Sequence, residues 1–148
     1  MYTLIKQFEG CELTSYYCAA GKLTIGYGNT FYKDGSPVKE GDTITKAEAE
    51  DLLAWYCREH VKLPKGEWNL KQKQALYSLA YNTGGSFYKS KCFKAIEKEE
   101  WETAFKEWNW VRAGGKILKG LQRRRKEERK LFFSHLLDVD FMEKKYYN

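Results

Sequence analysis

Three side chains able to take part in acid–base or nucleophilic chemistry lie close together near the start of the chain. Glu9 supplies a carboxyl group, Cys18 a thiol and Thr24 a hydroxyl. Apolar residues at helical spacing precede Glu9, and Gly10 follows it, so we predict a helix that ends at Glu9. A helix end beside a hairpin can bring these three groups into one cleft.

The hairpin is predicted from the pattern between these groups. Tyr16–Cys18 has the pattern of a short strand, Ala19–Gly21 that of a turn, and Lys22–Gly28 that of a return strand. On the return strand Thr24 points away from the apolar face, beside glycines that leave room for a ligand. Taken singly, a carboxyl, a thiol or a hydroxyl at such positions is more often structural than catalytic.

The complete pattern is more specific. Glu9, eight residues, Cys18, five residues and Thr24, followed by Ile-Gly-Tyr-Gly-Asn-Thr, resembles the catalytic signature of the phage-type lysozymes (endolysins), glycoside hydrolase family 24. In that family the middle position is usually Asp and occasionally Cys, and the following stretch usually reads Ile-Gly-Tyr-Gly-His-Thr. Here Cys18 takes the Asp position and Asn29 the His position.

Two distant segments resemble the same family. Residues 110–116 and 120–125 are similar to its Trp-x-x-Ala-Gly-Gly-Lys and Gly-Leu-x-x-Arg-Arg segments, with Lys119 where the family usually has Pro. Residues 80–84 resemble its mid-chain Phe-Asn-x-Gly, which borders the cleft. The match runs from about residue 1 to residue 134, and residues 135–148 resemble nothing known to us.

The resemblance implies an α+β, mostly helical, lysozyme-like fold, and the length suits one domain over residues 1–148. The expected hairpin lobe covers about residues 10–45, and a long connecting helix covers 46–61. The helical lobe comprises residues 1–9 and about 62–148.

Local patterns support several of the helices. Thr45 with Glu48 predicts a capping box before the connecting helix, and Asn69 with Gln72 predicts a cap before a central helix. On a helix that begins near Trp101, the aromatic residues have the spacing of a core face. We also predict a last long helix over residues 121–137, whose run QRRRKEERK is mostly a solvated face.

By this resemblance the enzyme is a lysozyme, an N-acetylmuramidase that hydrolyses the β-1,4 bond between N-acetylmuramic acid and N-acetylglucosamine. Glu9 is then the general acid that protonates the leaving oxygen. Cys18 is a base for the attacking water, a nucleophile, or a spectator beside a water held by Thr24. We favour attack by water, because an unperturbed thiol with a pKa of about 8.5 is mostly protonated at neutral pH. A cation such as Arg124 would change that balance.

The resemblance also suggests substrate-binding residues. Arg124, or its neighbour Arg123, is expected near the cleft, paired with Glu9 or holding an anionic group of the wall polymer. The full set of substrate-binding candidates is Tyr27, Thr30, Tyr81, Asn82, Ser90, Trp110 and Arg124.

Two other functions remain open. A lytic transglycosylase acts on the same bond and needs only one acid, so it would tolerate the loss of the Asp. A non-enzymatic basic module would instead bind wall or nucleic acid through its Lys and Arg side chains. Product mass separates the first two, and wall lysis that depends on Glu9 excludes the third.

Composition sets limits on partners and location. The net charge of +6 favours a polyanion, but no nucleic-acid-binding motif is visible, so we expect peptidoglycan as the partner and no nucleic acid. The four cysteines and two histidines show no ligand spacing, so we expect free thiols and neither metal nor cofactor. No apolar run resembles a signal peptide or a membrane span. We expect a monomer that accumulates in the host bacterial cytoplasm and depends on a separate holin to reach the wall.

Overall fold

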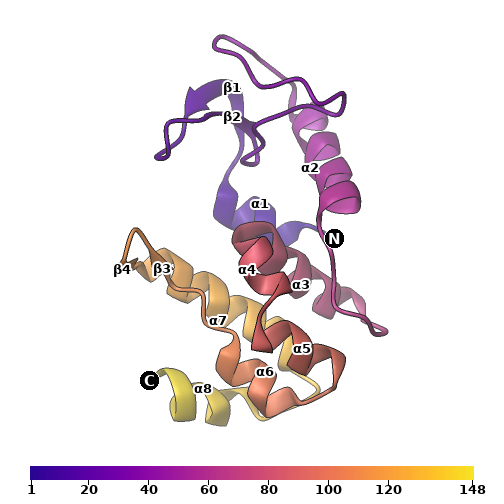
Figure 1. The fold of residues 1–148 in the computed structure, drawn as a ribbon, viewed down its shortest axis with the longest axis vertical. Helices are drawn as coiled ribbons and strands as arrows, with labels where there is room; N and C mark the ends of the chain where they lie inside the picture. Colours follow the sequence, from indigo (N-terminus) through magenta and orange to yellow (C-terminus); the bar gives the residue numbers. More distant parts are fainter. The chain divides into compact units, whose positions relative to one another are not determined.

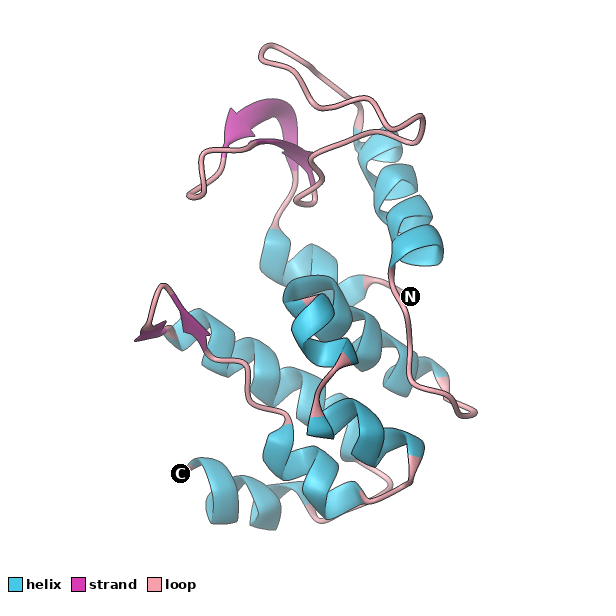
Figure 2. Cartoon of the chain, in the orientation of Figure 1, coloured by secondary structure: helices cyan, strands magenta, loops and turns pink.

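The computed structural model describes residues 1–148 as eight helices and two short β-hairpins (Figures 1 and 2). The chain divides into two compact units, the first covering Tyr2–Val61 and the second covering Lys62–Asn148 together with Met1. The predicted mostly helical α+β class, with a small hairpin near the start of the chain, is confirmed. The first unit contains the helix 3–9, which the sequence prediction had assigned to the helical lobe.

The first unit contains two helices that flank a hairpin: α1 (Thr3–Glu9), β1 (Glu12–Tyr17), β2 (Leu23–Gly26) and α2 (Lys46–His60). Helix α1 ends at Glu9 as predicted, because Gly10 follows with a φ of 70°. The capping box at the start of α2 is also present, with Thr45 accepting from the Glu48 amide at 3.1 Å. Cys57 is fully buried on this helix, as its apolar neighbours predict.

The hairpin differs from its prediction in length. β1 is longer than expected and leaves Cys18 just outside its end, while β2 stops at Gly26 instead of Gly28. Gly26 has a φ of 67°, and a Cβ atom there would lie 3.5 Å from Ala49 and Ile44. The backbone therefore packs closely against α2 at this point, and our prediction of open space beside Gly26 is wrong.

The core of the first unit forms beneath this hairpin. Ile25, Val38 and Leu52 are buried together. The residues between β2 and α2 form no further strand and make only isolated bridges such as Phe31 with Pro37. Packing of Val38 onto this apolar cluster holds the segment in place, together with backbone hydrogen bonds such as that from the Val38 amide to the Thr30 carbonyl at 3.0 Å.

The second unit is helical apart from one small hairpin, as Figure 2 shows. Its elements are α3 (Leu70–Thr83), α4 (Gly85–Tyr88), α5 (Lys91–Glu97), α6 (Trp101–Glu107), β3 (Arg112–Ala113), β4 (Lys116–Ile117), α7 (Lys119–Phe133) and α8 (Val139–Tyr147). Helices α3 and α7 pack against each other. Asn69 caps α3 as predicted, accepting from the Gln72 amide at 2.9 Å.

Helix α6 supplies the predicted apolar face. Ala104, Phe105 and the following Trp108 are fully buried, and Trp101 is half-buried. The Trp108 ring lies 5.3 Å from that of Phe132 on α7, centroid to centroid. These aromatic residues are therefore part of the core, as their helical spacing predicts.

Helix α7 corrects a prediction. The run QRRRKEERK was expected to be mostly solvated, yet Arg124, Arg125, Glu128 and Arg129 are all buried. The Glu128 carboxylate lies 2.7 Å from Arg125 Nε and accepts from Trp108 Nε1 at 3.1 Å. Burial of these charges is possible because each one has an opposite charge or a hydrogen-bond partner inside the unit.

Removing the central carboxylate is expected to destabilise the protein. Glu128→Gln leaves the buried Arg125 without its counter-charge, so the free energy of unfolding should fall by about 3–5 kcal/mol, measured by urea denaturation. Glu127→Gln is the matched control, since Glu127 is exposed on the same helix and should change stability by less than about 0.5 kcal/mol. Equal stability of the two variants would contradict this account of α7.

The Ala-Gly-Gly-Lys segment forms the turn of the small hairpin. β3 and β4 pair through Arg112 with Ile117 and Ala113 with Lys116, joined by Gly114 and Gly115. Both glycines have positive φ, 59° and 78°, which is the conformation that a tight two-residue hairpin turn requires. Lys119 then opens α7, at a helix position where proline is also favoured.

Candidate active site

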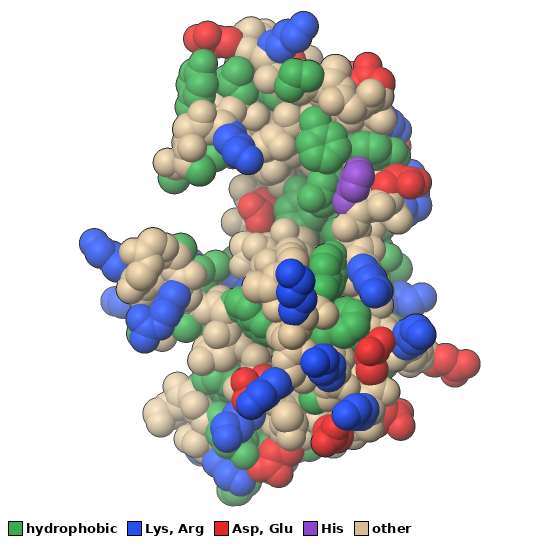
Figure 3. All heavy atoms as spheres, in the orientation of Figure 1, with side chains coloured by type: hydrophobic (Ala, Val, Ile, Leu, Met, Phe, Trp, Pro, Cys, Tyr) green, Lys and Arg blue, Asp and Glu red, His purple; other side chains and the backbone are tan.

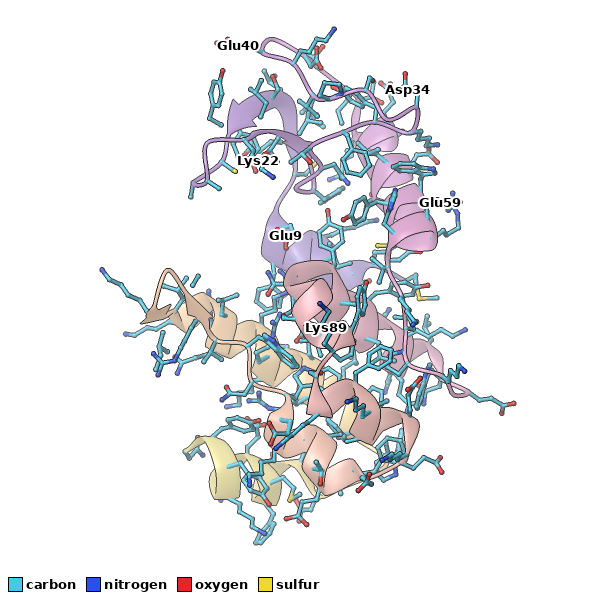
Figure 4. All side chains as sticks on the ribbon, viewed as in Figure 1. Glu9, Lys22, Asp34, Glu40, Glu59 and Lys89 are labelled. Carbon is cyan, nitrogen blue, oxygen red and sulfur yellow. The ribbon has the colours of Figure 1, made fainter.

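Glu9 is positioned by the end of α1. Its side chain is half-buried, and Figure 4 shows it at the end of α1 that leads into the hairpin carrying Lys22. Leu4 and Ile5 are buried and anchor the helix in the unit. An ion pair between Lys6 and Glu50 at 3.1 Å joins α1 to α2 and further fixes the helix. The carboxyl group is therefore held on a short but anchored element.

Cys18 lies in the tight turn between β1 and β2. Its backbone amide donates to the Lys22 carbonyl at 2.9 Å, and the Gly21 amide donates to the Cys18 carbonyl at 2.8 Å. Hydrogen bonds from the backbone amides of Lys22 and Ala20, and from the Thr24 hydroxyl, lower the pKa of the Cys18 thiol. Each of these donors favours the thiolate over the thiol, because hydrogen bonds to the charged form stabilise it.

Thr24 supports the thiol from the neighbouring strand. It lies opposite Tyr16 in the hairpin and is buried, with only 4% of its surface exposed. In the structure its hydroxyl donates to the Lys22 carbonyl at 3.0 Å, and rotation of the same O–H would instead direct it to the Cys18 thiolate, whose pKa it lowers. Thr24 was expected to face an open cleft, so its burial is a difference from the sequence prediction.

Tyr16 links the charges of this site. Burial raises its pKa, and the negative charges of Glu12, Cys18 and Glu9 raise it further. Glu9 and Cys18 therefore both lie within electrostatic range of one phenol group. Sequence reasoning did not single out Tyr16, although its position opposite Thr24 in a predicted hairpin would have been a usable signal.

The residues after Thr24 are more buried than a binding surface would be. Tyr27 is 3% exposed, and burial raises its pKa, together with a hydrogen bond and negative charge from Cys11. Thr30 is half-buried, and its carbonyl accepts from the Val38 amide at 3.0 Å. Asn29 is buried, and its Oδ1 atom has no hydrogen-bond partner in the structure.

The remaining candidates belong to the second unit. Tyr81 is half-buried and Asn82 is exposed near the end of α3. The Ser90 hydroxyl caps α5 by accepting from the Phe93 amide at 3.1 Å, and it donates to the Phe87 carbonyl at 2.7 Å. Trp110 packs edge-on against Phe87, with ring centroids 5.9 Å apart. Their contacts with substrate stay predictions.

Arg124 has several partners inside this unit. Its Nε atom donates to Ser78 Oγ at 3.1 Å, its Nη2 atom to the Ser78 carbonyl at 3.1 Å, and it lies 3.5 Å from Glu128. The neighbouring Arg123 is exposed. The predicted pairing of Arg124 or Arg123 with Glu9 stays a prediction.

The structure contains no group of three or more His, Cys, Asp or Glu side chains placed to hold a metal ion. None of its helices has both the length and the apolar character that a membrane crossing needs. The four cysteines are free thiols.

Comparison with known proteins places the chain in a family. A family model described as phage lysozyme matches residues 6–128. The endolysin of Bacillus phage B103 is 35% identical over 139 residues, covering 88% of this chain and 51% of that protein. The chain thus spans about half the length of this relative and of the endolysin of Bacillus phage PZA, which it also matches.

Solved structures agree with this match. An endolysin from Escherichia coli O157:H7 phage FAHEc1 superposes with a TM-score of 0.75 at 33% identity, covering 91% of each chain. The muramidase domain of SpmX from Asticaccaulis excentricus superposes with a TM-score of 0.67 at 28% identity, covering 88% of this chain and 92% of that one. The fold is lysozyme-like, and the protein belongs to the phage lysozyme family.

Proposed function

We propose that the protein is a phage endolysin that hydrolyses the β-1,4 bond between N-acetylmuramic acid and N-acetylglucosamine in bacterial peptidoglycan. One observation carries the proposal: Glu9, Cys18 and Thr24 lie in one unit at a helix end and its adjoining hairpin, with Glu9 and Cys18 both acting on Tyr16. This placement supports our assignment of the three signature residues to one chemical site.

Glu9 acts as the general acid. Breaking a glycosidic bond requires protonation of the leaving oxygen while positive charge develops at the anomeric carbon. Among the three signature residues only Glu9 carries a carboxyl group, and its half-buried position leaves it in reach of solvent and ligand. No step in this mechanism calls on a metal or a cofactor.

Cys18 acts as the base that activates water on the other side of the sugar. Its lowered pKa supports this role, because a larger fraction of the thiol is then ionised at neutral pH. The depressing groups are backbone amides and the Thr24 hydroxyl, so no neighbouring cation is needed. The same hydrogen bonds lower both the basicity and the nucleophilicity of the thiolate, so the anomeric configuration of the product is what distinguishes attack by water from attack by Cys18.

The relatives support a role in host cell lysis. The matched proteins of Bacillus phage B103 and E. coli phage FAHEc1 are named endolysins, and the SpmX domain is named a muramidase. We propose that peptidoglycan is both the substrate and the binding partner of this chain. We also propose that the protein is a monomer. It reaches the wall from the host cytoplasm after a separate holin opens the inner membrane.

A lytic transglycosylase is the second candidate, and one observation favours it. The position usually held by Asp carries Cys18, so a single carboxyl group remains in the signature. A transglycosylase needs one acid and no activated water, because the sugar's own hydroxyl closes an anhydro ring.

Product analysis tests the proposal. Purified peptidoglycan is digested, and the fragments are measured by mass spectrometry and by NMR of the newly formed anomeric centre. Hydrolysis adds the mass of one water per bond, and attack by water gives inverted configuration. Anhydro ends would establish the transglycosylase instead. Intact glycan with a well-folded protein would leave only the non-enzymatic binding module.

A further inference from the structure

A second possible ligand site lies in the helical unit. A cavity of about 420 Å³ opens between α7, α8 and the loop before β3. All of its lining residues belong to the second unit, and among them only Arg123 was considered above, as the alternative to Arg124 near Glu9. Lys and Arg side chains also project from the neighbouring β3–β4 hairpin, as Figure 3 shows.

The floor of this cavity is rigid and electrically balanced. Arg129 makes two hydrogen bonds to the Glu143 carboxylate, at 2.6 and 2.9 Å, and a third to the Trp108 carbonyl at 2.8 Å. Its guanidinium group also lies 3.7 Å from the centre of the Tyr147 ring. These contacts use the hydrogen-bonding groups of Arg129 and neutralise its charge. Arg129 therefore shapes the floor of the cavity but adds little positive charge for a ligand.

The rim, in contrast, carries unbalanced positive charge. Lys119, Arg123 and Lys126 line the cavity, are exposed, and make no ion pair in the structure. Their spacing places them on one face of α7, along about 10 Å of helix. Glu127 lies on the same helix but does not line the cavity. A terminal carboxylate at Asn148 would lower the charge by one and leave it positive.

We propose that this cationic groove, formed by Lys119, Arg123 and Lys126 over the Arg129 floor, binds a phosphodiester-linked polymer of the bacterial wall. A row of cations suits a repeating anion better than a single charged group. Arg and Lys both pair well with phosphate oxygens. The amides of Asn109 and Gln122 also line the groove and can bind hydroxyl groups between phosphates. The choice of a wall polymer rests on the proposed function.

The lining argues against two other polyanions. Proteins that bind single-stranded nucleic acid without sequence preference rely on stacking of bases onto aromatic rings. The aromatic residue of the groove is Tyr147, and the Arg129 guanidinium group already covers its ring. Binding at a membrane surface requires a broad apolar face beside the cations. Phe132 and Phe133 of α7 are instead buried, and the exposed apolar residues Ile117, Leu118 and Phe141 do not line the groove.

Soluble poly(glycerol phosphate), free of glycan, is a direct probe. The intact protein is compared with the double variant Lys119→Gln/Lys126→Gln by fluorescence polarisation of labelled polymer at low salt. The matched control is Lys71→Gln/Lys94→Gln, which removes the same charge from exposed, unpaired lysines elsewhere in this unit. Polyglutamate of similar length reports binding of a carboxylate polymer.

The groove variant should bind poly(glycerol phosphate) about tenfold more weakly, and the control variant within about twofold of the parent. Polyglutamate should bind the parent more weakly than the phosphate polymer does. Equal loss in both variants would show that net charge alone is responsible, and would overturn the proposal. So would a groove-dependent preference for duplex DNA or phosphatidylglycerol vesicles.

Cleavage of purified glycan is measured in parallel. Both double variants should cleave glycan at the parent rate, because none of the four substituted lysines belongs to the catalytic site. If the parent fails to cleave glycan, the proposed function is wrong while the binding comparison still decides the groove. The two proposals therefore fail separately.

Discussion

Replacing Glu9 with glutamine is expected to reduce the rate of peptidoglycan cleavage by at least about a thousandfold while leaving the fold intact. Glutamine has nearly the same shape but cannot give up a proton to the leaving oxygen. Glu9 is half-buried at the end of α1, where the amide can be accommodated without exposing the core. The measurement is the initial rate of turbidity loss of purified walls, with circular dichroism to confirm folding.

Glu12→Gln is the matched control for that variant. Glu12 is an exposed carboxylate on β1 whose charge acts on the same Tyr16 phenol as that of Glu9. Glu12→Gln removes a negative charge from the site but leaves the proton donor in place. This variant should therefore keep its cleavage rate within about threefold of the parent rate. Wild-type activity of Glu9→Gln, or equal losses in the two variants, would show that Glu9 is not the general acid.

Features determined by neighbouring residues could be predicted from the sequence. The caps at Thr45 and Asn69 involve partners three residues away, and both form as expected. The end of α1 at Glu9 requires only the glycine that follows. The spacing of Glu9, Cys18 and Thr24 likewise depends on one helix end and one hairpin. Such features follow from short-range geometry, so a single sequence is sufficient.

Features determined by distant partners could not be predicted. The basic run on α7 was judged solvated because its charges alternate at helical spacing, whereas Arg129 is buried against Glu143 on α8. Glu143 lies within residues 135–148, the segment for which the sequence showed no resemblance to the family. The positive φ at Gly26, which ends β2 and brings the backbone onto α2, was also invisible to strand periodicity.

The acidity of Cys18 is a third example. From the sequence, only a nearby cation such as Arg124 was considered able to produce a thiolate. The structure instead lowers the pKa of Cys18 through backbone amides of the turn that follows it and through the Thr24 hydroxyl. Backbone hydrogen-bond donors are present at every position, and only the turn geometry shows which ones converge on a side chain.

Substitutions of Cys18 are expected to separate the roles of base and nucleophile. Cys18→Asp restores the carboxylate usual in the family and should keep the cleavage rate within about tenfold of the parent, with inverted product configuration. Cys18→Ala removes the base but leaves Thr24 and Glu9, so we expect a loss of about a hundredfold, smaller than that of Glu9→Gln. Rates on purified peptidoglycan and NMR of the first-formed anomer provide the measurements.

The pH profile gives an independent test of the same role. The active thiolate is present above the pKa of Cys18 and is lost as the pH falls through it. Because that pKa is lowered, the acidic limb of the profile should lie below the usual thiol range. In Cys18→Asp the limb should move further down, since a free Asp titrates near pH 3.9. A covalent nucleophile would instead give retained configuration, a trapped glycosyl-cysteine adduct, and an alanine variant as inactive as Glu9→Gln. Those three results together would show that the Cys18 thiolate is the nucleophile and not the base.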